Sequence, residues 1–370
     1  MQSLGETTAR LRLSRLEHSV GGSMGGSALL ETADFGPNPG ALRMFSYRPD
    51  GWKPGAALVV VLHGCTQFAS AFAADGGWLR MADRCGFAVL APEQTAANNP
   101  ARCFNWFDGD DISRDRGEAA SIVAMVHWLV REASLDPGRV FVVGLSAGGA
   151  MTAGLLAAYP EVFVGGAIVA GLPAGVAGNL TEAMRLMHHG DSRSGADLAG
   201  LIPRPSPALP RLSIWQGDAD LVVNPLNAGA IVRQWAAARG LAETPDETER
   251  LGRRARSIWR SRQGGGVVLE LNVVAGLGHG VPLATREDGA VGAAAPVMLE
   301  VGISSTREIA AFWGLKESIG RRAAVHAGTG SCGSSRFGLG DQLMRSVADR
   351  VPESVREVIA KALRSAGLLK

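Results

Sequence analysis

The chain has 370 residues, of which 46% are hydrophobic and 49 are glycine, a composition typical of a compact globular protein. Its formal net charge of +2 gives no general attraction to polyanions, so we expect no nucleic-acid partner. No apolar stretch reaches the ~18 uncharged residues that a transmembrane helix needs. The four cysteines include no C-x-x-C pair and no metal-ligand cluster, so we expect neither a metal nor another cofactor.

Three parts of the chain differ in composition. Residues 1–40 are polar and glycine-rich, and we expect a partly ordered lead-in without the hydrophobic segment of a secretory signal. Residues 41–315 form the predicted main domain, in which the proline-rich stretch 172–210 reads as an insertion or lid. Residues 316–370 form a basic tail. Its amphipathic segment 346–369 is a predicted helix that docks on the body, with dimerisation or contact with an anionic surface as alternatives. The oligomeric state stays open.

From residue 41 onward, short apolar runs alternate with patterns of helical period. The predicted strands are Leu42–Tyr47, Leu58–His63, Phe87–Ala91, Val140–Gly144, Gly166–Ala170, Leu212–Gln216 and Val267–Val274. The predicted helices are 68–84, 116–133, 147–158, 225–239 and 304–314. This alternation favours an α/β fold, with a mostly parallel sheet covered by helices on both faces. The arginine-rich stretch 240–266 is interpreted as a solvated edge.

A G-x-S-x-G motif, Gly144-Leu-Ser146-Ala-Gly148, lies between a predicted buried strand and a predicted helix. This context is what a nucleophile elbow needs, because glycines without a Cβ let the chain turn sharply and lift a strained serine above the sheet edge. The sequence therefore predicts that Ser146 is a catalytic nucleophile. The alternative reading is a tight turn in a dinucleotide-type fold.

A nucleophilic serine needs a base and a group that orients the base. In hydrolases with this elbow the acid and the histidine follow the serine in that order, after later strands. Asp220 lies in the loop after the predicted strand 212–216 and is the candidate acid, with Asp218 as its rival. His279 lies in a glycine-flanked loop after the strand 267–274 and is the candidate general base.

The negative oxygen of a tetrahedral intermediate also needs hydrogen-bond donors. One candidate is the backbone N–H of Ala147, directly after the serine. The other is the N–H of Cys65, in the loop after the predicted strand 58–63, where Gly64 permits a close approach. His63 is expected to pack and brace this loop.

Four motifs in series resemble the polyhydroxybutyrate depolymerase-type esterases, which are α/β-hydrolases related to feruloyl and acetylxylan esterases. The motifs are Leu62-His-Gly-Cys-Thr-Gln67, Cys103-Phe-Asn-Trp-Phe107, Gly144-Leu-Ser-Ala-Gly-Gly149 and Gly217-Asp-Ala-Asp220, and the match covers about residues 40–315. The resemblance implies an α/β-hydrolase fold and a cofactor-free serine esterase with the triad Ser146, Asp220 and His279.

The same resemblance implies that Cys65 and Ala147 supply the oxyanion donors and that a disulfide joins Cys65 to Cys103. Two reduced thiols are the alternative. Resembling enzymes are often extracellular, whereas the N-terminus shows no secretory signal, so the compartment stays open.

The substrate-side residues are less determined by the sequence. The candidates are Trp106, Asn105 and His63; Trp106 could form a wall for an acyl group or be an ordinary core aromatic. The chain differs from the resembling esterases at Phe104 and at residues 280–282. The resemblance therefore supports the reaction mechanism more strongly than it supports a particular substrate.

The 55-residue tail does not resemble a polymer-binding domain, so soluble short-chain hydroxyalkanoate esters or oligomers are the expected substrates. Feruloyl, acetylxylan or general polyester hydrolysis is the alternative activity. A peptidase and a non-catalytic binding module are the alternatives of other classes.

Overall fold

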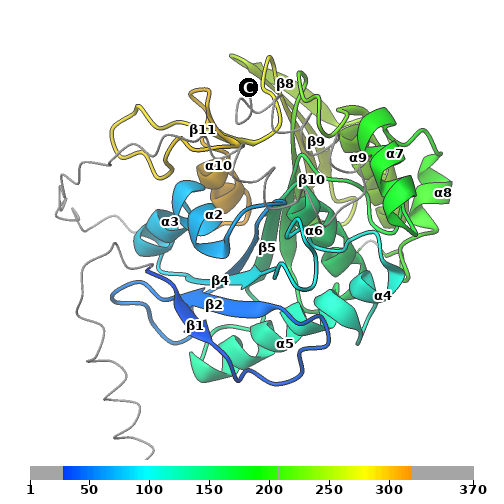
Figure 1. The fold of residues 1–370 in the computed structure, drawn as a ribbon. Helices are drawn as coiled ribbons and strands as arrows, with labels where there is room; N and C mark the ends of the chain where they lie inside the picture. Colours follow the sequence, from blue (N-terminus) through cyan, green and yellow to red (C-terminus); the bar gives the residue numbers. More distant parts are fainter. Residues whose placement is uncertain (1–27, 207, 318–370) are drawn as a thin grey trace, which may run out of the picture.

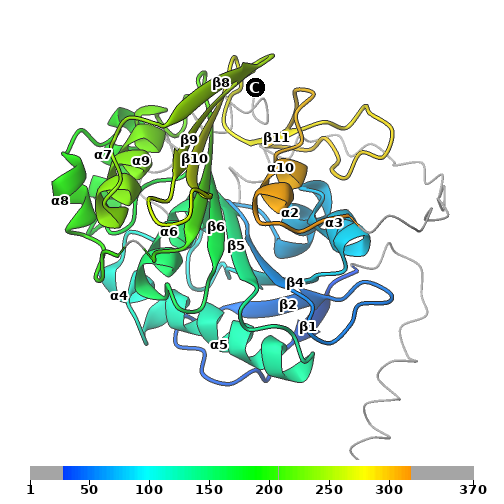
Figure 2. The same ribbon diagram turned by 180° about the vertical axis from the view of Figure 1, so that it is seen from behind.

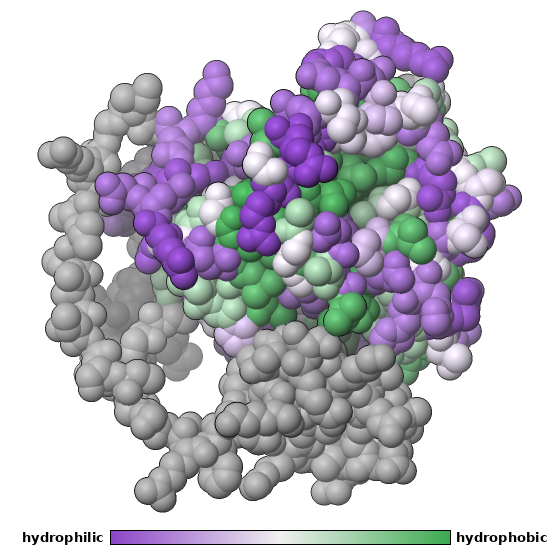
Figure 3. All heavy atoms as spheres, turned by 90° about the horizontal axis from the view of Figure 1, so that it is seen from above, coloured by the Kyte–Doolittle hydropathy of each residue, from purple (hydrophilic) through white to green (hydrophobic). Residues whose placement is uncertain are grey.

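The computed structural model describes residues 28–206 and 208–317 of the chain (Figure 1). The predicted helix at 346–369 and most of the lead-in therefore lie outside the described residues. Within the described ranges, no helix is long and apolar enough to cross a membrane. The outer surface is largely hydrophilic on the face seen in Figure 3, with hydrophobic patches between the polar side chains.

In the described part of the chain, a ten-stranded sheet forms the centre of the fold (Figure 1). Its strands are β1 (Leu30–Thr32), β2 (Arg43–Tyr47), β3 (Leu58–Leu62), β4 (Ala88–Glu93), β5 (Val140–Leu145), β6 (Gly165–Val169), β7 (Arg211–Gly217), β8 (Glu247–Leu251), β9 (Arg254–Arg260) and β10 (Val267–Val274). They lie in the order β1-β2-β4-β3-β5-β6-β7-β10-β9-β8. The inner strands from β4 to β10 pair in parallel, and antiparallel strands close both edges. A separate pair is formed by β11 (Val281–Leu283) and β12 (Met298–Glu300).

Helices cover both faces of this sheet, as the opposed views of Figures 1 and 2 show. They are α2 (Ala69–Asp75), α3 (Trp78–Cys85), α4 (Gly109–Ile112), α5 (Gly117–Glu132), α6 (Ala147–Ala158), α7 (Leu180–His189), α8 (Gly195–Ala199), α9 (Leu226–Arg239) and α10 (Ser305–Phe312). Buried side chains of α5, α6 and α9 share one core, and those of α2, α3 and α10 share the other. The molecule is thus a three-layer α/β fold.

Strand β3 shows how the sequence builds the two cores. Side chains alternate between the faces of a strand. Leu58, Val60 and Leu62 accordingly belong to the core beneath α5 and α6, whereas Val59 and Val61 belong to the core beneath α2 and α3. All five are completely buried, as expected of an inner parallel strand with helices on both sides.

The strands and helices predicted between residues 41 and 315 are present, and the mostly parallel sheet is confirmed. The structure adds elements where the sequence pattern was weak. The insertion 172–210 contains α7 and α8, the charged stretch 240–266 forms the β8–β9 hairpin at the sheet edge, and β1 extends the sheet into the predicted lead-in. The predicted helix 68–84 is two helices, because Gly77 adopts a left-handed φ of 85° between them.

Candidate active site

Ser146 lies at the sharp turn between β5 and α6, with a φ of 57° and a ψ of −118°. A positive φ is costly for a residue with a Cβ and persists only where the surroundings enforce it. The flanking glycines allow the turn: a Cβ on Gly144 would lie 2.1 Å from the carbonyl oxygen of Gly148, and one on Gly148 would lie 2.3 Å from that of Leu62. The Ser146 N–H donates to the Val169 carbonyl at 2.9 Å, which anchors the turn to β6. The partly exposed serine therefore stands in the geometry of a nucleophile elbow.

Asp220 is buried in the loop after β7, where protein groups hold its carboxylate. Its Oδ1 accepts the backbone N–H groups of Val222 at 2.8 Å and Val223 at 2.9 Å, and its Oδ2 accepts the Gln216 side-chain amide at 3.1 Å. N–H donors of this kind stabilise a buried negative charge. Gln216 is a supporting residue that the sequence pattern did not single out.

His279 lies in the loop after β10, and its Nδ1 is 2.8 Å from Asp220 Oδ2. Because a carboxylate can only accept, this contact places the proton on Nδ1 and leaves Nε2 able to take a proton from a neighbouring hydroxyl. The rival acid, Asp218, is exposed and accepts the Gly276 N–H at 2.6 Å. The histidine is thus paired with Asp220, while Asp218 ties together the loops that carry the two residues.

These two loops approach one another unusually closely. A Cβ on Gly217 would lie 2.1 Å from the carbonyl oxygen of Leu277, so only glycine fits there. The Ala219 N–H donates to that same Leu277 oxygen at 3.1 Å, and the Asp218 N–H donates to Val274 at 3.2 Å. The distance between acid and base is therefore set by backbone contacts as well as by the side chains.

The loop after β3 lies beside the elbow, because β3 pairs directly with β5. The N–H groups of Gly64, Thr66 and Gln67 are each used within the protein. No such bond involves the Cys65 N–H in the residues that the structure describes. The N–H of Ala147 lies in the first turn of α6, where backbone donors have no partner within the helix. Cys65 and Ala147 thus stay the candidate backbone donors for an oxyanion.

A disulfide joins Cys65 to Cys103, with 4.2 Å between the Cα atoms. The bond links the loop after β3 to the segment after β4. It excludes the alternative of two reduced thiols at this place.

The His63 side chain holds the loop after β3 in place through hydrogen bonds. The ring is completely buried, its Nδ1–H donates to the Gly64 carbonyl at 2.7 Å, and its Nε2 accepts the Gln94 N–H at 3.1 Å. Burial lowers the pKa of His63 to about 4, so the ring is neutral near pH 7. Both ring nitrogens are used in these two hydrogen bonds, so neither is free to bind a substrate. His63 can affect substrate binding only by holding the loop in place.

Glu118, at the start of α5, is a buried carboxylate that the sequence analysis missed. It accepts N–H groups from Gln94, Asn98 and Asn105, the last through both backbone and side chain. Burial raises the pKa of Glu118 to about 8, with Asp111 adding to this, while the N–H donors act in the opposite direction. In sequence the residue looks like any first-turn glutamate.

Hydrogen bonds connect Glu118 and its partner Gln94 to the loop after β3 by two routes. Gln94 donates its backbone N–H to His63, which holds Gly64. Gln94 also donates its side-chain amide to the Cys103 carbonyl at 3.1 Å, and Cys103 is bonded to Cys65. Glu118 therefore supports the position of the Cys65 N–H.

Of the other predicted substrate-side residues, neither extends freely into solvent. The side-chain amide of Asn105 bonds Glu118 through Nδ2 and Asn99 through Oδ1. Trp106 is 8% exposed and packs edge-on against Phe107. No group of three or more potential metal ligands occurs within residues 28–206 and 208–317.

Comparisons with known proteins agree with this architecture. Residues 46–257 match the family described as Esterase PHB depolymerase. The chain is 39% identical over 296 residues to poly(3-hydroxyalkanoate) depolymerase C of Paucimonas lemoignei, which covers 78% of this chain and 70% of that protein. It is 29% identical over 268 residues to feruloyl esterase B of Talaromyces funiculosus, with 69% of this chain and 74% of that protein covered.

The acetyl xylan esterase from Aspergillus awamori has a solved structure that matches with a TM-score of 0.65 at 23% identity, over 78% of this chain and 99% of that one. This likeness concerns the fold. The sequence relatives carry the assignment further: the chain belongs to the esterase PHB depolymerase family of α/β-hydrolases and is a carboxylic ester hydrolase.

Proposed function

We propose that the chain is a serine esterase in which Ser146 is the nucleophile, His279 the general base and Asp220 the acid that orients it. The observation that carries this proposal is the 2.8 Å contact between His279 Nδ1 and Asp220 Oδ2. The loops holding these two residues follow parallel strands and so lie at the sheet edge where the Ser146 elbow also stands.

In the first half of the reaction, Ser146 Oγ attacks the ester carbonyl carbon as His279 Nε2 takes its proton. The carbonyl oxygen becomes negative and accepts the N–H groups of Cys65 and Ala147. Each such donor is worth ~3–4 kcal/mol in the transition state. The intermediate collapses, His279 passes the proton to the departing alkoxide, and an acyl-enzyme and an alcohol result.

In the second half, His279 takes a proton from water, whose oxygen attacks the acyl-enzyme carbonyl. The second intermediate collapses, His279 returns the proton to the departing Ser146 Oγ, and the carboxylic acid is released. The buried Asp220 carboxylate keeps His279 in the tautomer that both halves need and stabilises the imidazolium that forms in each.

We propose short-chain hydroxyalkanoate esters and soluble oligomers as the substrate class. The support is the family match and the 39% identity to a protein named as a poly(3-hydroxyalkanoate) depolymerase. The catalytic unit is proposed to be residues 41–315, with β1 attached to its sheet. Feruloyl or acetylxylan-type hydrolysis is the second candidate, because feruloyl esterase B of Talaromyces funiculosus is a relative.

An ester panel tests the substrate class. Hydroxybutyrate oligomers, p-nitrophenyl esters of graded chain length, polyhydroxybutyrate, feruloyl sugar esters and acetylated xylan are assayed side by side. The highest kcat/KM is expected for the hydroxybutyrate oligomers and short acyl chains. A preference of tenfold or more for the feruloyl or acetylxylan substrates would replace the proposed class by the second candidate.

Matched variants test the mechanism. Ser146→Ala and Asp220→Asn are each expected to lower kcat by about 10⁴-fold or more, with Ser261→Ala, at the opposite end of β10, as the control. Asp218→Asn removes the rival acid and is expected to cost less than about tenfold. Turnover retained in Ser146→Ala contradicts the mechanism. A wild type that neither turns over any ester nor reacts with an organophosphonate would favour a binding module.

A further inference from the structure

A pocket of 370 Å³ lies between the end of α7 and α9, and most of its lining residues belong to the stretch 172–210 that was predicted as an insertion. Its volume falls in the range of ~300–1,000 Å³ that small-ligand sites occupy. The lining residues are His189, Asp191, Ser192, Arg193, Ser194, Leu226 and Arg233. The reaction scheme uses none of them.

The pocket adjoins the loop that carries the acid. Leu226, which lines the pocket, follows Asp220 by six positions at the start of α9. Asn224 lies between the two and is held by two hydrogen bonds. Its N–H donates to the Met187 carbonyl at 2.8 Å, and its side-chain amide donates to the His188 carbonyl at 3.0 Å. Helix α9 begins just after the loop that follows the carboxyl end of β7, so the Leu226 side of the pocket adjoins the loop that carries Asp220.

Two arginines and one aspartate line this pocket. Arg193 is held by Asp191 through Nε and Nη2. Arg233 donates Nε to the carbonyl of Arg193 at 3.2 Å and Nη2 to the carbonyl of Asp191 at 2.6 Å. These are neutral acceptors, and within the described ranges no ion pair is assigned to Arg233. The lining therefore carries one excess positive charge.

In the described residues neither arginine is assigned a hydrogen bond through Nη1. Glu182 and Asp197 also act on Arg193, but neither lines the pocket. Leu226 contributes an apolar wall that is 63% exposed.

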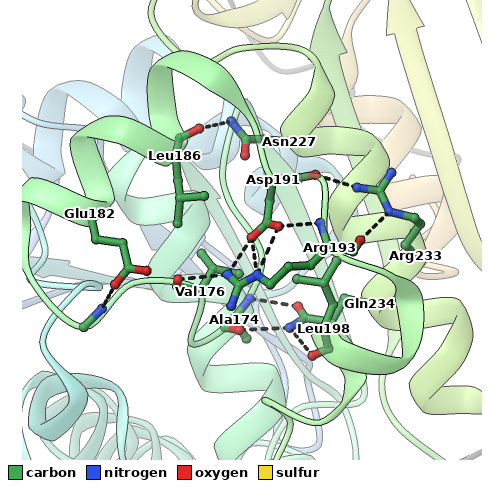
Figure 4. A network of polar contacts seen from close by, with 11 residues as sticks. Ala174, Val176, Glu182, Leu186, Asp191, Arg193, Leu198, Asn227, Arg233 and Gln234 are labelled. Atoms are coloured by element: carbon green, nitrogen blue, oxygen red, sulfur yellow. Dashed lines mark hydrogen bonds and ion pairs between the residues drawn. The ribbon is translucent and has the colours of Figure 1, made fainter.

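Hydrogen bonds to neighbouring backbone groups hold the surroundings of the pocket in place (Figure 4). Gln234, one position after Arg233, bonds the backbone of Ala174 in both directions and the carbonyl of Leu198. Arg193 Nη2 donates to the Val176 carbonyl at 3.0 Å. Groups fixed in this way lose little conformational entropy on binding, so more of their interaction energy appears as affinity.

We propose that this pocket binds the terminal carboxylate of an oligomeric ester substrate, with the adjoining alkyl group against Leu226. The inference rests on the proposed function. Hydrolysis of an oligoester leaves a free carboxylic acid on each acyl fragment, and this acid is ionised at neutral pH. An esterase that continues to shorten its own products therefore always meets a carboxylate-ended chain, which arginine recognises well.

The test compares hydroxybutyrate dimers, trimers and tetramers that end in a free carboxylate with the same oligomers capped as a methylamide. For the length that spans from Ser146 to the pocket, the free acid is expected to have a KM about tenfold lower at similar kcat, since the contact is equal in ground and transition states. Added salt to 0.5 M, a concentration at which charges are strongly screened, is expected to reduce the difference.

Arg233→Gln removes the positive charge that has no assigned ion pair in the described residues. The KM values for the free-acid and capped oligomers are compared within this one variant, so a general loss of activity cancels from their ratio. The ratio is expected to fall to nearly one, with Arg193→Gln as a second variant. Arg131→Gln changes net charge equally at the exposed C-terminal turn of α5 and is expected to keep the wild-type ratio.

Equal KM values for free and capped oligomers at every length in the wild type would refute the carboxylate site, whether or not a variant folds. A ratio unchanged in both arginine variants would also refute it. Failure of the proposed substrate class gives a different result, in which neither free nor capped oligomers are cleaved although other esters are. That result would also refute the proposed carboxylate site.

Discussion

Lowering the pH from 7 to 4 is expected to destabilise the folded chain through His63. The ring is completely buried, and burial lowers its pKa from 6.5 to about 4. The unfolded chain therefore takes up a proton near pH 6.5, whereas the folded chain resists protonation until about pH 4. The stability that the neutral ring allows is present above pH 6.5 and is lost between pH 6.5 and 4.

The magnitude follows from the two pKa values. Each pKa step corresponds to about 1.4 kcal/mol, so the gap between 6.5 and about 4 amounts to about 3 kcal/mol. This is a large part of the 5–15 kcal/mol typical of a domain. Protonation would also remove the acceptor for the Gln94 N–H, which lies 3.1 Å from Nε2.

Urea unfolding of the oxidised protein at pH 7, 6, 5 and 4, followed by tryptophan fluorescence, measures this effect. His63→Asn cannot titrate, so the stability difference between wild type and variant is expected to shrink by about 3 kcal/mol over this range. His127→Asn, at an exposed position of α5, is the control and is expected to follow the wild type. A wild-type-minus-variant difference for His63→Asn that stays constant with pH would refute the reasoning.

Three further predictions concern the surroundings of the site. Gly148→Ala places a Cβ 2.3 Å from a backbone oxygen, so it is expected to lower the free energy of unfolding by at least about 2 kcal/mol and to remove most of the activity. The control Gly109→Ala meets no atom within 4 Å and is expected to change neither. Thermal melts and kcat measurements check both variants. Glu118→Leu is expected to lower kcat at least about tenfold with little change in KM, and Glu118→Gln to recover part of the loss; an effect on KM alone would contradict a positioning role. Reducing the Cys65–Cys103 bond, which closes a loop of 38 residues, is expected to cost about 4 kcal/mol of stability, and equal melting temperatures with and without reductant would contradict this.

The fold followed from the sequence wherever an element was strongly apolar. Strand β5 is continuous and buried, and it runs into the glycine-flanked motif around Ser146, so its position and its turn were both predictable. The β8–β9 hairpin escaped because β8 (Glu247–Leu251) is polar and mostly exposed, and its cross-strand contacts include ion pairs such as Arg256 with Glu249. Local pattern carries no information about partners on another strand.

The same distinction applies to the candidate site. Each predicted triad residue lies in the turn or loop after a strand, and the parallel topology brings these strand ends to one edge, which is why the sequence could single out these positions. Glu118 and Gln216 could not be found in this way. Their importance depends on which backbone segments come to rest beside them, which only the folded chain determines.

The close approach of Gly217 to the Leu277 carbonyl has a consequence for protein engineering. The loop that carries Asp220 and the loop that carries His279 are interlocked through main-chain atoms, so neither can be exchanged alone for that of a relative without breaking the fit. A chimera that aims at a new specificity has to transplant residues 216–224 and 274–280 together as one unit.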